Sequence, residues 1–172
     1  MALSKIDVAN MLTGTIPQGN VATSSLPSGT ILQVVRNFIP NSPSVLTTSS
    51  SFVASGIQAS ITPTASGNLI IVDFSSSMNN TGGVGTAKMY LKVGSGSIDE
   101  LPGITNGQYQ VGYANSGHNR YAPHCFGGSY TATSTDVLLF EPYMKASSSS
   151  YGVAHTNSSS SLTLTEVKVW WL

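Results

Sequence analysis

The residues that could ligate a metal or act as a thiol nucleophile are few, since the chain has three histidines and one cysteine in 172 residues. His124 and Cys125 are adjacent, and neighbouring side chains on a strand point to opposite faces, so they cannot share an ion or form a thiol–imidazole pair. No Cys-x-x-Cys, His-x-x-x-His or Glu-x-x-His spacing occurs. We expect no metal and no cofactor, and we interpret Cys125 as a buried apolar residue. The alternative is a histidine site built by folding, from His118 or His155 with His124, or on an oligomer axis.

Hydrolytic chemistry finds little support. The sequence contains no Gly-x-Ser-x-Gly elbow for an activated serine. Asp99-Glu100 is the one adjacent carboxylate pair, whereas Asp73, Asp136, Glu141 and Glu166 stand isolated on expected strands. Asp99-Glu100 is interpreted as a solvated loop turn, with a Ca²⁺ site as the alternative. We therefore expect no enzymatic activity.

Aromatic residues offer a binding surface instead. Tyr109, Tyr113, His118, Tyr121 and Tyr130 crowd a segment rich in Gly, Asn and Ser. Tyrosine among small polar residues is the composition of adaptable recognition surfaces. Flat rings beside Asn and His also suit stacking on sugar faces. The alternative is that these rings fill the core and an oligomer axis.

The amino-acid composition limits the classes of partner that the protein could bind. Only 8% of residues are charged, against about 25% in an average soluble protein, and the net charge is zero. Seven Lys and Arg spread over the chain give no footprint for nucleic acid or for an anionic membrane. The single cysteine excludes an intrachain disulfide. A neutral sheet protein is expected to hide its strand edges by closed oligomerisation.

No targeting segment is visible in the sequence. Lys5 and Asp7 interrupt the start before any useful apolar run, and no apolar run approaches the roughly 18 residues of a membrane span. We expect a protein that is made soluble in a cytoplasm.

The elements that must position these residues are strands. The clearest is the last, Leu162 to Leu172, where Leu162, Leu164, Glu166 and Lys168 fall on one face of an extended chain and Thr and Val on the other. Trp170 and Trp171 point opposite ways, so one is expected to pack in the core and the other on a neighbour.

Upstream, short strands alternate with turn residues. Asn68 to Phe74 is nearly continuously apolar and predicts a central strand buried on both faces at its middle. Gly94 to Gly107 is expected to be a loop. We expect eight or nine strands and no helix after Gly29. That pattern predicts an all-β antiparallel sandwich or barrel. The other predicted strands are Thr30 to Phe38, Ser51 to Ile61 broken at Gly56, Thr86 to Val93, Gln108 to Tyr113, Tyr121 to Tyr130, Asp136 to Met144 and Tyr151 to His155.

The first 27 residues differ from the rest. Gly14, Pro17 and Gly19 stop any regular element soon after a short helical pattern. We interpret residues 1–27 as an extended arm that becomes ordered on a neighbouring subunit or larger assembly, and residues 28–172 as the head domain; a loose leader or a first strand is the alternative. The predicted anchoring residues are Leu3, Ile6, Met11, Leu12, Ile16 and Pro17.

Several stretches of the sequence are similar to one family. Ser28 to Val35 reads Ser-Gly-Thr-Ile-Leu-Gln-Val-Val, Thr47 to Val72 ends Ala-Ser-Gly-Asn-Leu-Ile-Ile-Val, and Leu162 to Val167 reads Leu-Thr-Leu-Thr-Glu-Val. These stretches resemble a domain common in virion proteins of tailed bacteriophages. The resemblance implies a jelly roll of the tumour-necrosis-factor and C1q type that assembles as a homotrimer. Asn10 to Pro17 also resembles short repeats that precede such heads in tail-fibre proteins.

The resemblance implies a non-enzymatic virion structural protein, made in the host cytoplasm and carried on the particle. We expect a short tail fibre or spike whose arm binds other virion proteins of the tail, baseplate or capsid, and whose loops between Gly94 and Ser134 contact host surface carbohydrate. The rival within the class is a capsid head decoration, or cement, protein. A hydrolytic tailspike tip and a free carbohydrate-binding module are the alternatives from other classes.

Overall fold

The computed structural model describes residues 22–40, 45–80, 83–102, 109–113, 120–146, 151–153 and 159–169 of the chain. The predicted anchoring residues, from Leu3 to Pro17, lie outside these ranges. So do His118, His155, Trp170 and Trp171. The statements made about these residues from the sequence stay predictions.

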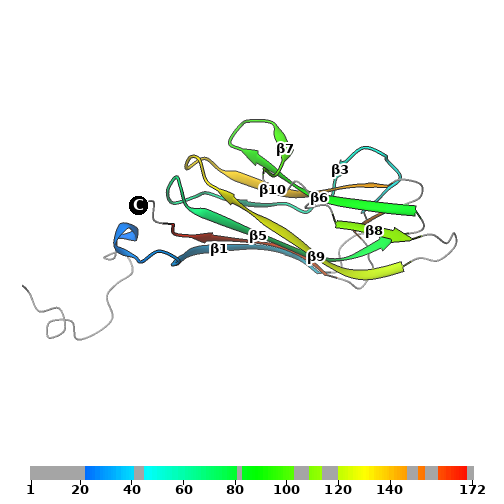
Figure 1. Ribbon diagram of the computed structural model, residues 1–172, viewed down its shortest axis with the longest axis horizontal. Helices are drawn as coiled ribbons and strands as arrows, with labels where there is room; N and C mark the ends of the chain where they lie inside the picture. Colours follow the sequence, from blue (N-terminus) through cyan, green and yellow to red (C-terminus); the bar gives the residue numbers. More distant parts are fainter. Residues whose placement is uncertain are drawn as a thin grey trace, which may run out of the picture.

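Within the described ranges the chain forms twelve strands and a single 3-10 turn, η2 (Thr23–Ser25). Figure 1 shows the strands as two layers, with β5, β9 and β1 in one and β10 and β6 in the other. The strands are β1 (Ile31–Ile39), β2 (Val45–Thr47), β3 (Val53–Ala54), β4 (Ala59–Ile61), β5 (Leu69–Asn80), β6 (Gly83–Val93), β7 (Ile98–Glu100), β8 (Tyr109–Tyr113), β9 (Arg120–Thr131), β10 (Leu138–Ala146), β11 (Tyr151–Val153) and β12 (Ser160–Val167).

The strand order is that of a jelly roll. Sheet 1 runs β1-β12-β5-β11-β2, and β9 also pairs with β5. Sheet 2 runs β3-β10-β6-β7, with β4 on β10 and β8 on β6. Every pairing is antiparallel, and the first and last strands are neighbours. The predicted all-β antiparallel sandwich of jelly-roll type is confirmed.

The core lies between the two sheets and follows the two-residue period of a strand. In β12 the buried positions alternate with half-buried ones, so Leu162, Leu164, Glu166 and Lys168 share the inner face, as the sequence predicts. The largest fully buried apolar side chains come from both sheets, and they are Phe74, Phe140, Ile61, Ile70, Leu101, Leu138, Met144, Leu162 and Leu164.

The prediction that β5 is buried on both faces is wrong. β5 is central in sheet 1, between β12 and β9, but Ile71 is half-buried and Asp73 is exposed. Sheet 2 covers one side of sheet 1 only, so the apolar run has an inner row, with Ile70 and Val72, and an outer row. The predicted loop Gly94 to Gly107 is also wrong in part, because Ile98–Glu100 forms β7 on the edge of β6.

Lys168 fixes residues 23–30 to the end of β12. Its backbone exchanges hydrogen bonds with Gly29 N (2.8 Å) and Thr30 O (2.9 Å). Its Nζ donates to Thr23 O (2.7 Å) and to Leu26 O. The chain therefore enters the head beside the end of its last strand, and Figure 1 shows η2 at that end of the sandwich.

Replacing Lys168 with Ala is expected to release η2 without opening the sandwich. The amides of Ser25 and Leu26 donate within the turn, to Ala22 O and Thr23 O. Without the ammonium holding the turn, their hydrogen exchange should rise by at least about tenfold, which corresponds to about 1.4 kcal/mol of lost local stability. The Gly29 amide is the internal control, since its partner is the Lys168 backbone. Unchanged exchange at Leu26 would mean that Nζ does not hold the turn.

Candidate interaction surfaces

The structure does not gather the predicted recognition tyrosines in one place. In β9, Tyr121 pairs with Asn79 and Tyr130 pairs with Ile70, nine positions apart, which is about 30 Å of strand. Tyr113 pairs with Gly83, at the same end as Tyr121, and Tyr109 pairs with Ala87. Tyr130 thus belongs to the end of the sandwich where the chain enters, and the other three stand toward the far end.

The outward side of sheet 1 is rich in exposed apolar residues. Ile31, Val34 and Phe38 of β1 are 61%, 57% and 50% exposed. The register carries this side across the sheet, because Val34 pairs with Thr165 and Thr165 pairs with Ile71. We call this surface the outer face. Its members from the three strands are Ile31, Val34, Arg36 and Phe38 of β1, Ser161, Thr163, Thr165 and Val167 of β12, and Leu69, Ile71, Asp73 and Ser75 of β5.

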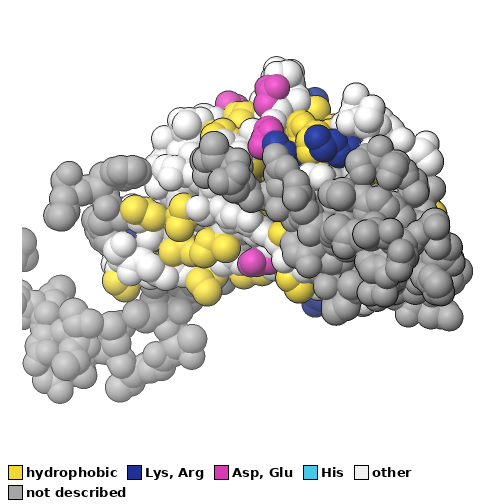
Figure 2. All heavy atoms as spheres, turned by 45° about the vertical axis from the view of Figure 1, so that its right-hand side comes forward, with side chains coloured by type: hydrophobic (Ala, Val, Ile, Leu, Met, Phe, Trp, Pro, Cys, Tyr) yellow, Lys and Arg dark blue, Asp and Glu magenta, His cyan; other side chains and the backbone are white. Residues whose placement is uncertain are grey.

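Charge on the outer face is minimal. Arg36 and Asp73 are its two charged members. Both pair with Thr163 of β12, which lies between them, so their backbones are two strand spacings apart, about 10 Å. The Arg36 guanidinium lies 5.0 Å from the Phe38 ring centroid, so it covers an apolar ring. Figure 2 shows another aspect of the molecule, where the described surface is likewise mainly uncharged.

Cys125 is exposed, which corrects the prediction that it is buried. The strand period explains the error: Phe126 turns inward and packs edge-on against Phe74, with ring centroids 5.1 Å apart, so its neighbour Cys125 turns outward. Cys125 Sγ donates to Ser75 Oγ at 3.4 Å across the β5–β9 pair. Among the described residues, no group of three His, Cys, Asp or Glu side chains is placed to hold a metal ion.

Asp99 and Glu100 act separately, because adjacent residues of β7 point to opposite sides. Glu100 pairs with Lys88 Nζ at 2.7 Å on the outside of sheet 2. Asp99 Oδ2 accepts a hydrogen bond from Ser97 Oγ at 2.6 Å. The interpretation of this pair as a solvated loop turn is therefore wrong about the loop, since both residues lie in β7, and right about the solvent, since both are exposed. The two carboxylates do not converge on one ion.

Two of the carboxylates that look isolated in the sequence, Glu141 and Glu166, are buried and accept hydrogen bonds, whereas Asp73 and Asp136 are exposed. Glu141 accepts hydrogen bonds from Gly56 N (2.8 Å) and Gln58 Nε2 (2.7 Å). Glu166 is 0% exposed and accepts from Gln33 Nε2 (2.6 Å), from Thr64 N and Oγ1 (both 2.8 Å) and from Asn68 Nδ2 (2.7 Å). These partners lie far away in the sequence, so no local pattern could reveal them. Both residues join sheet to loop and serve the fold.

Burial opposes the ionised form of Glu166, but the hydrogen bonds outweigh it. Loss of water around the carboxylate raises its pKa, whereas the donors Gln33, Asn68 and Thr64 lower it. The net result is a pKa of Glu166 below its ordinary value. The folded protein therefore holds this group as a carboxylate at neutral pH.

Sequence reasoning missed an aromatic cluster on the outside of sheet 2. The rings of Tyr90 and Tyr143 stack with centroids 4.1 Å apart, and Phe52 lies 6.0 Å from Tyr90. Lys145 and Lys88 place Nζ 4.7 and 5.3 Å from the Phe52 centroid. Burial, followed by the nearby Glu100 and Asp99, raises the pKa of Tyr90. The alternation of Lys88, Tyr90 and Lys92 was the available signal, but the partner Phe52 is remote in sequence.

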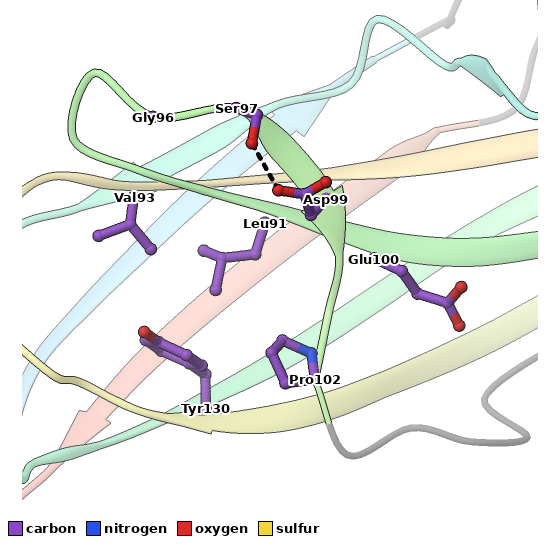
Figure 3. Close-up of a pocket in the computed structure, with 8 residues that line it drawn as sticks. All are labelled: Leu91, Val93, Gly96, Ser97, Asp99, Glu100, Pro102 and Tyr130. Carbon is purple, nitrogen blue, oxygen red and sulfur yellow. Dashed lines mark hydrogen bonds between the residues drawn. The ribbon is translucent and has the colours of Figure 1, made fainter.

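A pocket of about 300 Å³ opens between the β6–β7 hairpin and β9. Figure 3 shows Leu91 and Val93 pointing into it from β6, with Tyr130 and Pro102 across from them and Asp99 above. The Tyr130 hydroxyl shares a hydrogen bond with Thr133 Oγ1 at 3.2 Å, which orients the ring. The pocket thus combines an apolar wall with two carboxylate residues, Asp99 and the Glu100 that pairs with Lys88. Its lining residues are Leu91, Val93, Gly96, Ser97, Asp99, Glu100, Pro102 and Tyr130.

Comparison with known proteins gives little. No protein-family model matches the chain, and no curated protein matches it. Among solved structures, one titled "Structure of infectious bursal disease virus Gt strain" is similar at 14% identity and a TM-score of 0.34, over 80% of this chain and 42% of that one. At this TM-score the likeness adds nothing to the fold assignment, which rests on the strand pairing. Among the described residues, no helix has the length and apolarity needed to cross a membrane.

Proposed function

We propose that this protein is a non-enzymatic virion structural protein: the trimeric jelly-roll head of a short bacteriophage fibre or spike, attached to the particle through residues 1–27 and contacting the host surface. The observation that carries the proposal is the outer face of sheet 1. The phage-head resemblance of Ser28 to Val72 and of Leu162 to Val167 supplies the class of particle.

The outer face suits burial against identical copies of the chain. Ile31, Val34 and Phe38 are each at least half exposed. The outer face carries two charged residues, Arg36 and Asp73, with β12 between them. Ile31 and Val34 lie beside the half-buried Val167, Leu69 and Ile71, and an exposed apolar patch of this kind marks an interaction site in a soluble protein. A closed ring of identical copies would cover the outer face without leaving an exposed apolar edge. The family resemblance implies three copies in the ring.

The entry point of the chain supports a polar arrangement on the particle. Lys168 holds Thr23 and Leu26 at one end of the sandwich. Attachment through residues before 22 then directs the opposite end outward, where β8 and the start of β9 carry Tyr113 and Tyr121. This arrangement puts two of the predicted recognition residues on the host side.

Val34→Lys should dissociate the trimer, because it puts an ammonium in the middle of the outer face. The matched control is Val137→Lys, since Val137 is 50% exposed, close to the 57% of Val34, and lies on the turn before β10, outside that face. We expect light scattering to give a monomer for the first variant and an unchanged trimer for the second. A trimer that survives Val34→Lys would exclude the outer face as the interface.

The place in the particle decides between a fibre and a head decoration protein. A fibre or spike is present at low copy number on the tail, whereas a decoration protein covers the shell at high copy number. Quantitative gel analysis of purified particles measures that copy number. High copy number, together with failure of labelled protein to adsorb to any susceptible host, would favour the decoration role.

A further inference from the structure

We propose that the pocket between the β6–β7 hairpin and β9 binds a single neutral pyranose ring at the end of a glycan. The inference concerns a site apart from the host contact proposed for the far end of the sandwich, because Tyr130 lies at the end where the chain enters. It does not depend on how the trimer is built. Its residues are Leu91, Val93, Asp99, Ser97, Pro102 and Tyr130.

The shape of the pocket fits one small ring. About 300 Å³ is at the lower end of the range that small ligands occupy, about 300–1,000 Å³. A longer saccharide would have to extend into solvent. Tyr130 presents an aromatic ring in the wall of the pocket, and its hydroxyl is already bonded to Thr133. A ring held in place loses little conformational freedom when a ligand packs on it.

The apolar wall suits the C–H face of a sugar. Leu91 and Val93 come from the inner face of β6 near its end, and Pro102 follows β7. Pyranoses have one face made largely of C–H groups, which packs against aromatic and aliphatic side chains. Tyr130 with Leu91, Val93 and Pro102 provides that kind of surface. Of the tyrosines that the sequence predicts to stack on sugars, Tyr130 is the one that lines this pocket.

The polar groups select hydroxyl donors and disfavour anions. Asp99 is an acceptor whose two oxygens offer more lone-pair sites than the one hydrogen bond from Ser97 Oγ uses. The lining residues include no Lys or Arg, so a ligand carboxylate or phosphate would meet the Asp99 carboxylate with no cation in the pocket. Glu100, the other lining carboxylate, is paired with Lys88. A neutral sugar that donates hydroxyls to Asp99 is the complementary chemistry.

The pocket stays open in the proposed trimer. Tyr130 alternates with Ser129 and Thr131 along β9, and its neighbour on the strand-paired β5 is the buried Ile70. It therefore lies on the opposite side of sheet 1 from the outer face. Assembly through the outer face and sugar binding at the pocket can be disturbed separately.

Saturation-transfer NMR with the full-length trimer tests the proposal. The probes are the methyl glycosides of glucose, galactose, mannose and N-acetylglucosamine, with N-acetylneuraminic acid as the charged comparison. We expect transfer to the protons of one face of at least one neutral glycoside and none to the acid. If none of the neutral glycosides receives transfer, or if the acid binds best, the proposal is overturned.

Two variants place the binding. Tyr130→Ala and Asp99→Ala should each weaken the binding of the glycoside by at least about tenfold, from loss of the ring face and of the acceptor. Asp99 is exposed, so its variant is expected to fold even if Tyr130→Ala does not. Tyr143→Ala, in the separate aromatic cluster, is the control and should leave affinity unchanged. Unchanged affinity in both pocket variants would overturn the proposal, while light scattering on the same samples reports assembly independently.

Discussion

Gly127→Ala is expected to destabilise the head by at least about 3 kcal/mol, or to prevent folding, because a methyl group there has no room. A Cβ on Gly127 would lie 2.0 Å from Val72 O and 3.0 Å from Val72 C. Both are backbone atoms of the central strand β5, to which β9 is paired along its whole length. Relief therefore requires β9 to move away from β5. Urea denaturation followed by circular dichroism measures the loss.

Gly56→Ala provides the matched comparison. Gly56 has a φ of 75°, which an L-residue adopts only with strain, but a Cβ added there would meet no other atom within 4 Å. We expect a cost of about 1–2 kcal/mol from backbone strain alone. If Gly127→Ala cost no more than Gly56→Ala, the close approach of β9 to β5 would be wrong.

Glu166→Ala is expected to cost about 3–5 kcal/mol, because it removes a fully buried carboxylate and leaves its donors, of which Asn68 is itself buried, without that acceptor. Gln33, Thr64 and Asn68 all direct hydrogen bonds at this one carboxylate, which is 0% exposed. These donors tie β1 and the turn before β5 to β12. Glu100→Ala is the control. The Glu100 side chain, which pairs with Lys88, is 41% exposed, and surface ion pairs of this kind contribute about 0–1 kcal/mol to stability. Equal losses in the two variants would contradict the network.

The same carboxylate predicts a pH dependence. The pKa of Glu166 is lower in the folded protein than in the unfolded chain, so its contribution is fully present above the unfolded value and is lost as pH falls through the folded one. The difference in unfolding free energy between wild type and Glu166→Gln should therefore shrink on acidification below the ordinary glutamate range. A free-energy difference between the two proteins that grows on acidification would contradict a lowered pKa of Glu166 in the folded protein.

Strand periodicity was enough to predict the class of fold. Leu162, Leu164, Glu166 and Lys168 share the inner face as their spacing indicates, because a period of two leaves no other arrangement in a covered sheet. Continuous apolar runs carry less information. Asn68 to Phe74 predicts a strand buried on both faces at its middle, yet its outer row with Ile71 faces away from sheet 2. Hydrophobicity alone does not distinguish the inner row of a strand from its outer row.

The candidate sites depend on contacts that are distant in sequence, which explains what the sequence missed. The pocket joins Tyr130 to Leu91, and the aromatic cluster joins Phe52 to Tyr90 and Tyr143. The prediction for Cys125 failed for a local reason, since its apolar character did not reveal that Phe126 occupies the inward position. The pairing register of the strands determines which side chains meet in the pocket and in the aromatic cluster and which way Cys125 points, and this register cannot be read directly from the sequence.

The molar mass of the purified full-length protein, measured by light scattering coupled to size exclusion, tests the central proposal most directly. We expect three times the 17.9 kDa of one chain, at concentrations where Val137→Lys gives the same mass and Val34→Lys gives the mass of a monomer. A mass of 17.9 kDa for the wild type would contradict it, because Ile31, Val34 and Phe38 would then be stable in water without any copy to cover them.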